Sequence, residues 1–329
     1  MNRLPLTVAL SESDRVRALF DGTIAIEGVD ANLLALPVEE IFFRAVTNQE
    51  FDVCELSFSS YMIGLSRGAL PYLALPVFLS RAFRHSAIYV HADRNIRKPA
   101  DLIGRKVGMP EYQLTACLWV RGLLADEYGV QPKDIHWRLG GVESPGRKEK
   151  IAVAPPPGVD IQTIGPEDTL SAMLLDGRID ALICPRAPSI FRKEPKIVRL
   201  FADFRAVERA YFAKTGVFPI MHVVAVRQSL IEKNPWLPAS LCKAFGAAKD
   251  RALHQLDEVA ALPVALPWLA QEVEETRALM GADWWPYGLE KSRKTLEAAL
   301  RHSFEQGLSV RKLSVEELFA KGTDEQFKI

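Results

Sequence analysis

The sequence lacks several features that mark particular classes of protein. Its four cysteines are far apart and form no CxxC pair, so neither a zinc knuckle nor a thioredoxin-type site is supported. No stretch approaches the roughly 20 apolar residues that a membrane helix needs. There is also no Walker loop, no GxGxxG after a strand, no GxSxG and no HExxH. The familiar signatures of nucleotide-dependent enzymes, serine hydrolases and zinc proteases are therefore missing.

The chain also lacks an excess of charge of either sign. Lysine and arginine together number 41, and aspartate and glutamate together number 41, so the net charge is zero. This balance argues against a nucleic acid or an anionic membrane as partner, because both need a surplus of basic charge on one face. A bound anion must therefore be held by a few local cations. The first residues show no charged segment followed by a long apolar run, which predicts a cytoplasmic location.

What the chain does contain is an alternation of strand-like and helix-like segments. Its 329 residues, 48% hydrophobic and 25% charged, are typical of a globular protein of about two domains. Strands and helices alternate over the first 90 residues or so, and the alternation starts again near Asp93. From Gln228 onward the pattern is almost wholly helical. This order predicts an α/β protein with a mostly parallel sheet, covering helices and a helical C-terminal tail.

We expect the two α/β units to form a two-lobed clamshell. Lobe one is predicted to comprise residues 1–90 and 223–329, and lobe two residues 91–222. The chain would cross between the lobes near His91 and again near His222, with the helical tail packing on lobe one. Two crossings make a hinge, and ligands usually bind in the cleft between two such lobes.

Polar side chains follow two of the predicted strands. In open α/β sheets ligands sit beyond the carboxyl ends of the strands, and hydroxyl and backbone N–H groups at a helix start favour an anion. Serine at a helix start is nevertheless more often a cap than a ligand contact. The candidates for substrate binding are Ser11, Asp14 and Arg15 after the first strand, and Ser57, Ser59 and Tyr61 after the strand at residues 51–56.

Basic residues gather just before the predicted hinge. Arg81, Arg84 and His85 stand in the segment at residues 80–86, and arginine offers a planar fork that matches a carboxylate. Arg186 follows a predicted strand of lobe two, and His222 lies in the second crossing strand. The two histidines could in principle hold a metal with Glu55 or Asp14, but no spacing demands one, so we expect no metal.

Several segments resemble a known family. The most specific are Phe-Arg-His-Ser at residues 83–86 and Pro-Ile-Met-His at residues 219–222. The stretch Phe-Asp-Val-Cys-Glu-Leu-Ser at residues 51–57 also matches, while Asp-Leu-Ile-Gly-Arg-Lys-Val at residues 101–107 is common to binding proteins generally. The chain is similar, along almost its whole length, to the 4,5-dihydroxyphthalate decarboxylases, which are built on the type II periplasmic binding-protein fold.

The resemblance implies nonoxidative loss of CO₂ from a small aromatic diacid, with no cofactor. Such chemistry needs an acid, a base, a grip for two carboxylates and little water. His85 or His222 would be the acid or base, since imidazole titrates near neutral pH, and Glu55 would orient a histidine or take a phenolic proton. The substrate would be held by Arg15, Arg84 and Arg186, with Arg81 as a weaker candidate, and by Ser11, Ser57, Ser59 and Tyr61.

Two other functions are compatible with the same fold, because a fold does not decide function. One is a solute-binding protein for an aromatic or sulfonated anion that feeds a transporter. The other is a biosynthetic enzyme acting on a chorismate-derived carboxylate. The two histidines near the hinge favour chemistry, since a receptor needs no proton shuttle. A homo-oligomer is also possible, because the tryptophans of the tail (Trp268, Trp284 and Trp285) could cover a partner subunit.

Overall fold

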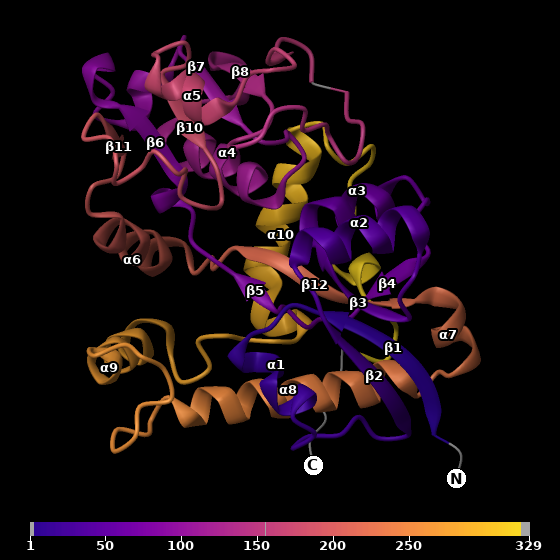
Figure 1. The fold of residues 1–329 in the computed structure, drawn as a ribbon. Helices are drawn as coiled ribbons and strands as arrows, with labels where there is room; N and C mark the ends of the chain where they lie inside the picture. The colour runs from indigo at the N-terminus through magenta and orange to yellow at the C-terminus, as the bar shows by residue number, and fades with distance from the viewer. Residues whose placement is uncertain (1–2, 155, 324–329) are drawn as a thin grey trace.

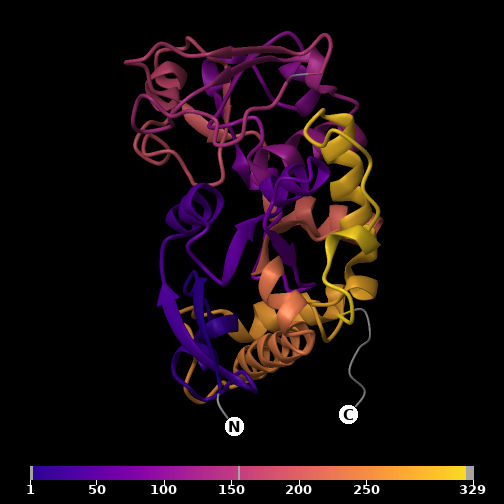
Figure 2. The ribbon, with the colours of Figure 1, turned by 90° about the vertical axis from the view of Figure 1, so that its right-hand side faces the viewer.

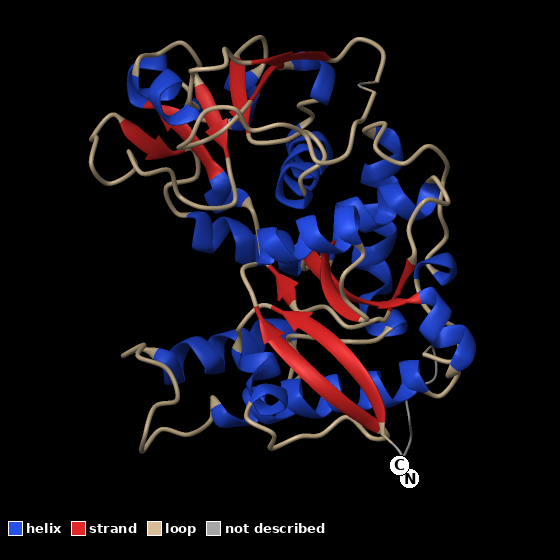
Figure 3. Cartoon of the chain, turned by 45° about the vertical axis from the view of Figure 1, so that its right-hand side comes forward, coloured by secondary structure: helices blue, strands red, loops and turns tan. Residues whose placement is uncertain are grey.

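A computed structural model describes residues 3–154 and 156–323 of the chain. It contains two separate β-sheets with helices around them, one in the lower part of Figure 1 and one in the upper part, and Figure 3 shows the two groups of strands apart from one another. The predicted two-lobed α/β fold is confirmed. The predicted bounds of the lobes stay a prediction, and residues 1–2 and 324–329 of predicted lobe one lie outside the described residues.

The first sheet has the order β2-β1-β3-β12-β4, with β5 also pairing with β12. Strands β1, β2 and β3 are parallel, whereas β12 runs antiparallel to β3, β4 and β5. Strands β1 to β5 of this sheet therefore point the same way, in agreement with the predicted mostly parallel sheet, and β12 is reversed because the chain returns from the second lobe in the opposite direction. Its strands are β1 (Leu4–Leu10), β2 (Val29–Ala35), β3 (Val53–Ser57), β4 (Tyr72–Ala74), β5 (Ser80–Arg81) and β12 (Ile220–Arg227).

The second sheet has the order β11-β6-β10-β7-β8-β9. Strands β10, β7, β8 and β9 are parallel, and β6 runs antiparallel to both β10 and β11. Its strands are β6 (Ile88–His91), β7 (Lys106–Met109), β8 (His136–Leu139), β9 (Asp160–Thr163), β10 (Ala181–Ile183) and β11 (Ile197–Arg199).

Helices cover both faces of the first sheet because its strands bury side chains on both sides. Along β3, Val53 packs with residues of α1 and α8, whereas Cys54 and Leu56 pack with α2 and α3 on the other face. This alternation is the two-residue period of a strand. The helices are α1 (Asp14–Phe20), α2 (Val38–Asn48), α3 (Phe58–Ser66), α4 (Thr115–Tyr128), α5 (Leu170–Leu175), α6 (Phe204–Thr215), α7 (Gln228–Lys233), α8 (Leu237–Gln255), α9 (Leu269–Met280) and α10 (Leu289–Glu305).

The sequence predicted that the helical tail packs on lobe one. In the structure α8 does so, but α10 also contacts the second lobe. Helix α8 lies along α1 beneath the first sheet, but α10 contacts α3 and β12 on one side and α4 of the second lobe on the other. Figure 2 shows α10 in yellow, running along the side of the molecule from one lobe toward the other. The apolar face of α10 includes Leu296 and Ala299, which join one core shared by both lobes.

Two chain segments connect the sheets, residues 82–87 between β5 and β6 and residues 216–219 between α6 and β12. Both are visible in the middle of Figure 1. They lie beside one another, because the Ala82 N–H donates to the Pro219 carbonyl over 3.1 Å. Among the described residues, no helix has the length and apolar character needed to cross a membrane.

Candidate active site

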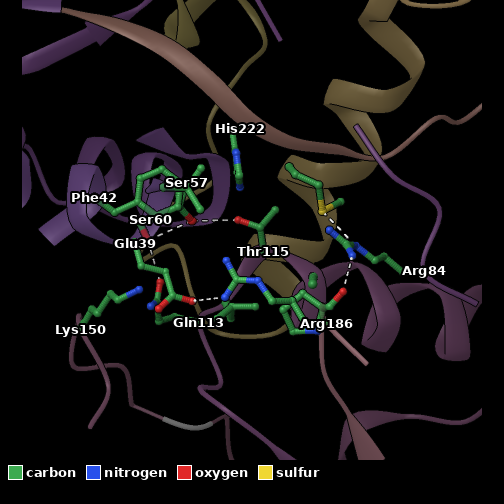
Figure 4. Close-up of a pocket in the computed structure, with 15 residues that line it drawn as sticks. Glu39, Phe42, Ser57, Ser60, Arg84, Gln113, Thr115, Lys150, Arg186 and His222 are labelled. Carbon is green, nitrogen blue, oxygen red and sulfur yellow. Dashed lines mark hydrogen bonds and ion pairs between the residues drawn. The ribbon is translucent and has the colours of Figure 1, made fainter. Parts of the chain in front are cut away.

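A cavity of about 220 Å³ lies between the two lobes. Residues from α2, β3, α3 and β12 form one wall, and residues at the start of α4 and after β10 form the other (Figure 4). The lining residues are Val38, Glu39, Phe42, Ser57, Ser60, Arg84, Gln113, Leu114, Thr115, Ala116, Lys150, Pro185, Arg186, Met221 and His222.

The imidazole of His222 lines this cavity, and a hydrogen bond to Glu55 fixes the ring on the side away from the cavity. Its Nδ1 lies 2.6 Å from Glu55 Oε1, and the ring points into the cavity in Figure 4. The other carboxylate oxygen, Glu55 Oε2, accepts hydrogen bonds from Ser11 N at 2.9 Å and from Ser11 Oγ at 2.6 Å. Ser11, Glu55 and His222 therefore form one chain of hydrogen bonds that leaves Nε2 of His222 on the side of the cavity.

Strand pairing brings these three residues together. In the antiparallel pair of β3 and β12, Glu55 stands opposite Val224 and Ser57 stands opposite His222. Glu55 and His222 are thus diagonal neighbours on one face of the sheet, a spacing that long side chains bridge. Ser11 directly follows β1, which pairs with β3 on its other side.

Glu55 is fully buried, and its surroundings favour the ionised form. Burial raises the pKa of this carboxyl, but the hydrogen bond and positive charge of His222 and the two hydrogen bonds from Ser11 together outweigh burial. The pKa of Glu55 is therefore held below its usual value. A buried carboxylate on Nδ1 fixes the orientation of the ring and stabilises an imidazolium, which prepares Nε2 to give or take a proton.

The N-terminal ends of α3 and α4 meet at the cavity. Ser57 Oγ lies 2.9 Å from Thr115 Oγ1, and Ser60 Oγ donates to Gln113 Oε1 over 2.8 Å. These two hydrogen bonds connect the first lobe to the second lobe at the cavity. A helix N-terminus carries a partial positive charge, so two of them together with several hydroxyls form a favourable place for an anion.

From the sequence we expect a helix from Glu111 to Tyr128, closed by Gly129, but α4 begins at Thr115. Residues 110–114 form a turn instead, because the Tyr112 N–H donates to the carboxylate of Glu149, and Gln113 Nε2 donates to Glu111 Oε2 over 2.6 Å. This difference has a functional consequence, since it places the start of α4 at the cavity rather than one turn away.

Three cations line the cavity. Arg84 comes from the first connection between the lobes, where partial burial lowers its pKa, and Arg186 follows β10. Lys150 comes from the segment after β8, and its Nζ lies 5.9 Å from the ring centre of Phe42. In Figure 4 these side chains approach from sides other than that of His222. The lining thus combines an imidazole, a group that can give or take a proton, with several cations that can hold a dianion.

The structure places some of the predicted substrate ligands outside this lining. Arg15 Nη1 pairs with Asp14 at 2.5 Å, its Nε donates to the Leu79 carbonyl, and its guanidinium lies over the ring of Trp285. Neither Asp14 nor Arg15 lines the cavity.

Tyr61 and Ser59 of α3 also point elsewhere. The Tyr61 hydroxyl donates to the Leu318 carbonyl and accepts from the Ala74 N–H, so it ties the C-terminal segment to the first sheet. The Ser59 backbone N–H donates to Thr115 Oγ1 over 3.0 Å, but Ser59 Oγ is buried without a hydrogen-bond partner among the described residues. Of this helix start, Ser57 and Ser60 are the residues that face the cavity.

His85 does not line the cavity either. Its ring is buried against Phe201 and Tyr211, with centroids 5.3 Å away in both cases, and neither nitrogen has a hydrogen-bond partner among the described residues. Burial lowers the pKa of His85 to about 4, so the ring is neutral near pH 7. This geometry favours His222 over His85 as the proton-transfer residue.

Arg81 has the surroundings of a structural residue. Its Nη1 donates to the Phe218 carbonyl over 2.9 Å, and its Nη2 donates to the Pro286 carbonyl and to Ser292 Oγ over 2.8 and 2.7 Å. Burial lowers the pKa of Arg81 to about 9. The side chain therefore joins β5 to the segment before α10 and does not face the cavity.

We expect Arg81→Met to destabilise the protein by about 3 kcal/mol, because several buried acceptors lose their donor. Urea denaturation measures this loss. The folded fraction should keep the KM of the wild type, since Arg81 does not line the cavity. A rise in KM without loss of stability would restore Arg81 as a substrate ligand.

Several lining residues were not among those predicted from the sequence. Gln113 and Thr115 follow the strand at Lys106–Met109, so the rule of residues beyond strand ends also points to them. No pattern marks Lys150. Glu39 and Phe42 belong to the exposed and apolar faces of an ordinary amphipathic helix, and only its position against β12 brings them to the site.

No group of three or more histidine, cysteine, aspartate or glutamate side chains that could hold a metal ion occurs within residues 3–154 and 156–323.

The fold is that of the periplasmic binding proteins. Residues 27–153 match the family model described as the periplasmic substrate-binding protein of a phosphonate ABC transporter. The structure is similar to the aliphatic sulphonate binding protein SsuA of Escherichia coli, with 14% identity, 98% of this chain and 99% of that chain covered, and a TM-score of 0.54. It is equally similar to the alkanesulfonate-binding SsuA of Xanthomonas axonopodis pv. citri, with 12% identity, 97% and 99% coverage and a TM-score of 0.54.

Within this fold class, the curated relatives of the chain are enzymes. The chain is 45% identical to the 4,5-dihydroxyphthalate decarboxylase of Comamonas testosteroni over 100% of both chains. It is 47% identical to the protein of that name from Pseudomonas putida, over 62% of this chain and 79% of the relative. The chain belongs to the 4,5-dihydroxyphthalate decarboxylase family, and the predicted family resemblance is confirmed.

Proposed function

We propose that this protein is a carboxy-lyase that converts 4,5-dihydroxyphthalate to protocatechuate and CO₂ without a cofactor. The observation that carries the proposal is His222, which faces an interlobe cavity while a buried carboxylate holds its other nitrogen. A binding protein needs no such residue, because it moves no proton. The names of the curated relatives support the same reaction.

The reaction needs a proton at the carbon that carries the departing carboxylate. Direct loss of CO₂ would leave an unstable aryl anion. Protonated His222 instead gives its Nε2 proton to that ring carbon, while the hydroxyl para to it passes its proton to solvent and the ring becomes a dienone. The carbon–carbon bond then breaks, CO₂ leaves, and its electron pair restores the aromatic ring. The same oxygen takes a proton back from solvent once the ring is aromatic again. One proton replaces one carboxylate in each turnover, and His222 is reprotonated from solvent.

The lining of the cavity suits an aromatic diacid. We place the departing carboxylate near His222 and the apolar side chains of Phe42 and Met221, where a weakly solvated carboxylate loses CO₂ more readily. The retained carboxylate binds Arg186 and Arg84, which reach the cavity from other sides (Figure 4). Ser57, Ser60 and Thr115 hold the hydroxyl groups, since hydroxyls both donate and accept.

Incubation of the purified protein with 4,5-dihydroxyphthalate tests the proposal. We expect release of CO₂ and formation of an equal amount of protocatechuate. Chromatography and absorbance measure the product. Tight binding with no turnover would instead support the solute-binding protein, which the phosphonate family model and the SsuA structures leave open. Phthalate serves as the control ligand, because it has both carboxylates but no hydroxyl group to form the dienone.

Three further properties belong to this proposal and remain predictions. The partner is a small aromatic carboxylate, with neither nucleic acid nor membrane, and the location is cytoplasmic, where an enzyme of aromatic breakdown meets its substrate. A homo-oligomer also stays a prediction. Of the tail tryptophans, Trp268 is exposed, whereas Trp284 is buried and Trp285 donates to the Phe78 carbonyl.

A further inference from the structure

An ion pair joins the two lobes at the edge of the cavity. Glu39, in the first turn of α2, places Oε1 3.2 Å from Nη1 of Arg186, which follows β10. Arg147 Nη1 lies 4.0 Å from the same oxygen, but the closest partner of Arg147 is Glu111, 2.6 Å from its Nη2. Glu39 is therefore paired chiefly with Arg186, a cation that we place on the retained carboxylate of the substrate. Figure 4 shows this pair below the cavity.

The same pair stands between two cavities. A second cavity of about 560 Å³ is lined by the loop at residues 141–147 and by residues 184–187. It shares Glu39, Leu114, Pro185 and Arg186 with the inner cavity that contains His222. The Glu39–Arg186 pair therefore belongs to the boundary between the outer and the inner cavity.

The pair is accessible and weak. The side chains of Glu39 and Arg186 are 47% and 74% exposed, and ion pairs in contact with water contribute little free energy. A carboxylate on a ligand makes the same charge-assisted hydrogen bonds to a guanidinium as a carboxylate on the protein. A bound diacid can therefore replace Glu39 at Arg186 without a loss of hydrogen bonds.

We propose that Glu39 is a specificity residue that competes with the substrate for Arg186. This inference rests on the proposed function and deepens it. In the empty site Glu39 occupies Arg186, and an incoming dianion displaces it because Arg84 attracts the same carboxylate as Arg186, and Lys150, beside Phe42, attracts the second one. After loss of CO₂ the product carries a single carboxylate and is attracted less strongly. Glu39 then regains Arg186 and favours release of the product.

Ligand binding to four proteins tests this competition: the wild type, Glu39→Gln, Arg186→Gln and the double variant. Isothermal titration with phthalate measures binding separately from turnover. We expect Glu39→Gln to bind phthalate about two- to fivefold more tightly, as loss of a weak competing ion pair predicts. In the Arg186→Gln background the same change should give no gain, because the competitor acts through Arg186. The affinity for protocatechuate, titrated in parallel, should rise at least as much on Glu39→Gln.

Several results would overturn the proposal. Weaker or unchanged phthalate binding by Glu39→Gln would make the pair a latch that holds the lobes together, or a contact without consequence. A gain in phthalate affinity that persists in the Arg186→Gln background would show that Glu39 acts on the ligand by its negative charge alone and not through Arg186. Absence of phthalate binding in both the wild type and Glu39→Gln would also contradict the competition.

Glu40→Gln is the matched control. Glu40 is the next residue of α2, lies 2.9 Å from Arg44 and does not line either cavity, so its substitution removes the same charge from the same helix. Its phthalate affinity should equal that of the wild type. If no protein decarboxylates 4,5-dihydroxyphthalate but Glu39→Gln still gains affinity for phthalate, the proposed function fails and the competition at Arg186 stands.

Discussion

Replacement of His222 by asparagine is expected to lower kcat by about 10²- to 10⁴-fold, the usual contribution of a positioned general acid. KM should change by less than about threefold, because the carboxylates are held by other residues. The physical reason is the geometry of the site. The buried Glu55 holds Nδ1 at 2.6 Å, so the opposite nitrogen faces the cavity, where the ring carbon must receive its proton.

His136→Asn is the matched control for this variant. His136 Nδ1 also lies 2.8 Å from a carboxylate, that of Asp160, but on the surface of the second lobe and outside the cavity. We expect it to keep the kcat of the wild type. An equal loss of kcat and of substrate affinity in His222→Asn would refute the proton-transfer role, since a binding residue affects both.

His85→Phe decides between the two histidines that the sequence left as alternatives. His85 packs among Phe201 and Tyr211, so phenylalanine fits an aromatic environment. We expect this variant to keep the kcat of the wild type, because the ring does not line the cavity. A loss of kcat as large as that of His222→Asn would show that both histidines take part.

Glu55→Gln is expected to lower kcat by about 10²-fold or more, by analogy with other carboxylates that orient a catalytic histidine. Ser11 N is an obligate donor to Glu55 Oε2, so the new amide must turn its oxygen toward Ser11 and its NH₂ group toward His222. Nδ1 must then accept a hydrogen bond. A ring whose Nδ1 accepts a hydrogen bond is a neutral imidazole, which gives up the proton on Nε2 far less readily than an imidazolium does, so proton transfer to the substrate slows.

The pH dependence separates this positioning role from simple damage to the fold. Ionised Glu55, whose pKa lies below its usual value, stabilises the protonated ring of His222. The wild type should therefore lose kcat as acid protonates Glu55, at a pH below the usual carboxyl range, whereas Glu55→Gln has no carboxyl to titrate and should lack this acid limb. A loss of activity with an unchanged pH profile would contradict the assignment.

Asp52→Asn controls for removal of a carboxylate from the same part of the sheet. Asp52 accepts a hydrogen bond from Thr7 N at 2.9 Å and lies 3.7 Å from Arg227, at the end of β3 away from the cavity. Its substitution should leave the kcat profile in place. Thermal unfolding of each variant confirms that the comparison is made on folded protein.

Much of the architecture could be predicted from local sequence. From Ser11 and Ser13, which can cap a helix, and from Gly22, which can end one, the sequence predicts a helix from about Asp14 to Phe20, and α1 has these bounds. The candidate site was predicted only in part. Ser57, Arg84, Arg186 and His222 line the cavity, and Glu55 and Ser11 stand behind it. The rule of residues at or beyond strand ends accounts for Ser11, Ser57 and Arg186, whereas Glu55 and His222 lie within β3 and β12.

Residue type and position in the sequence do not distinguish residues that line the cavity from structural residues of the same type. Arg81 and Arg84 are three positions apart, yet Arg81 is buried against backbone carbonyls while Arg84 reaches the cavity. His85 follows directly and is buried among aromatic rings. The chemical type of a side chain indicates what it can do, but its direction depends on the packing of segments far away in the chain.

The sequence by itself determined the alternation of strands and helices, the two-lobed class and the family, because these depend on local periodicity and on short motifs. Only the tertiary structure decided which side chains meet. His222 and Glu55 are 167 positions apart and become partners because β12 returns antiparallel beside β3. Glu39 and Arg186, which come from different lobes, become partners because the cleft brings α2 to the end of β10. Strand direction and lobe closure are set by burial of the whole core, and no local pattern encodes them.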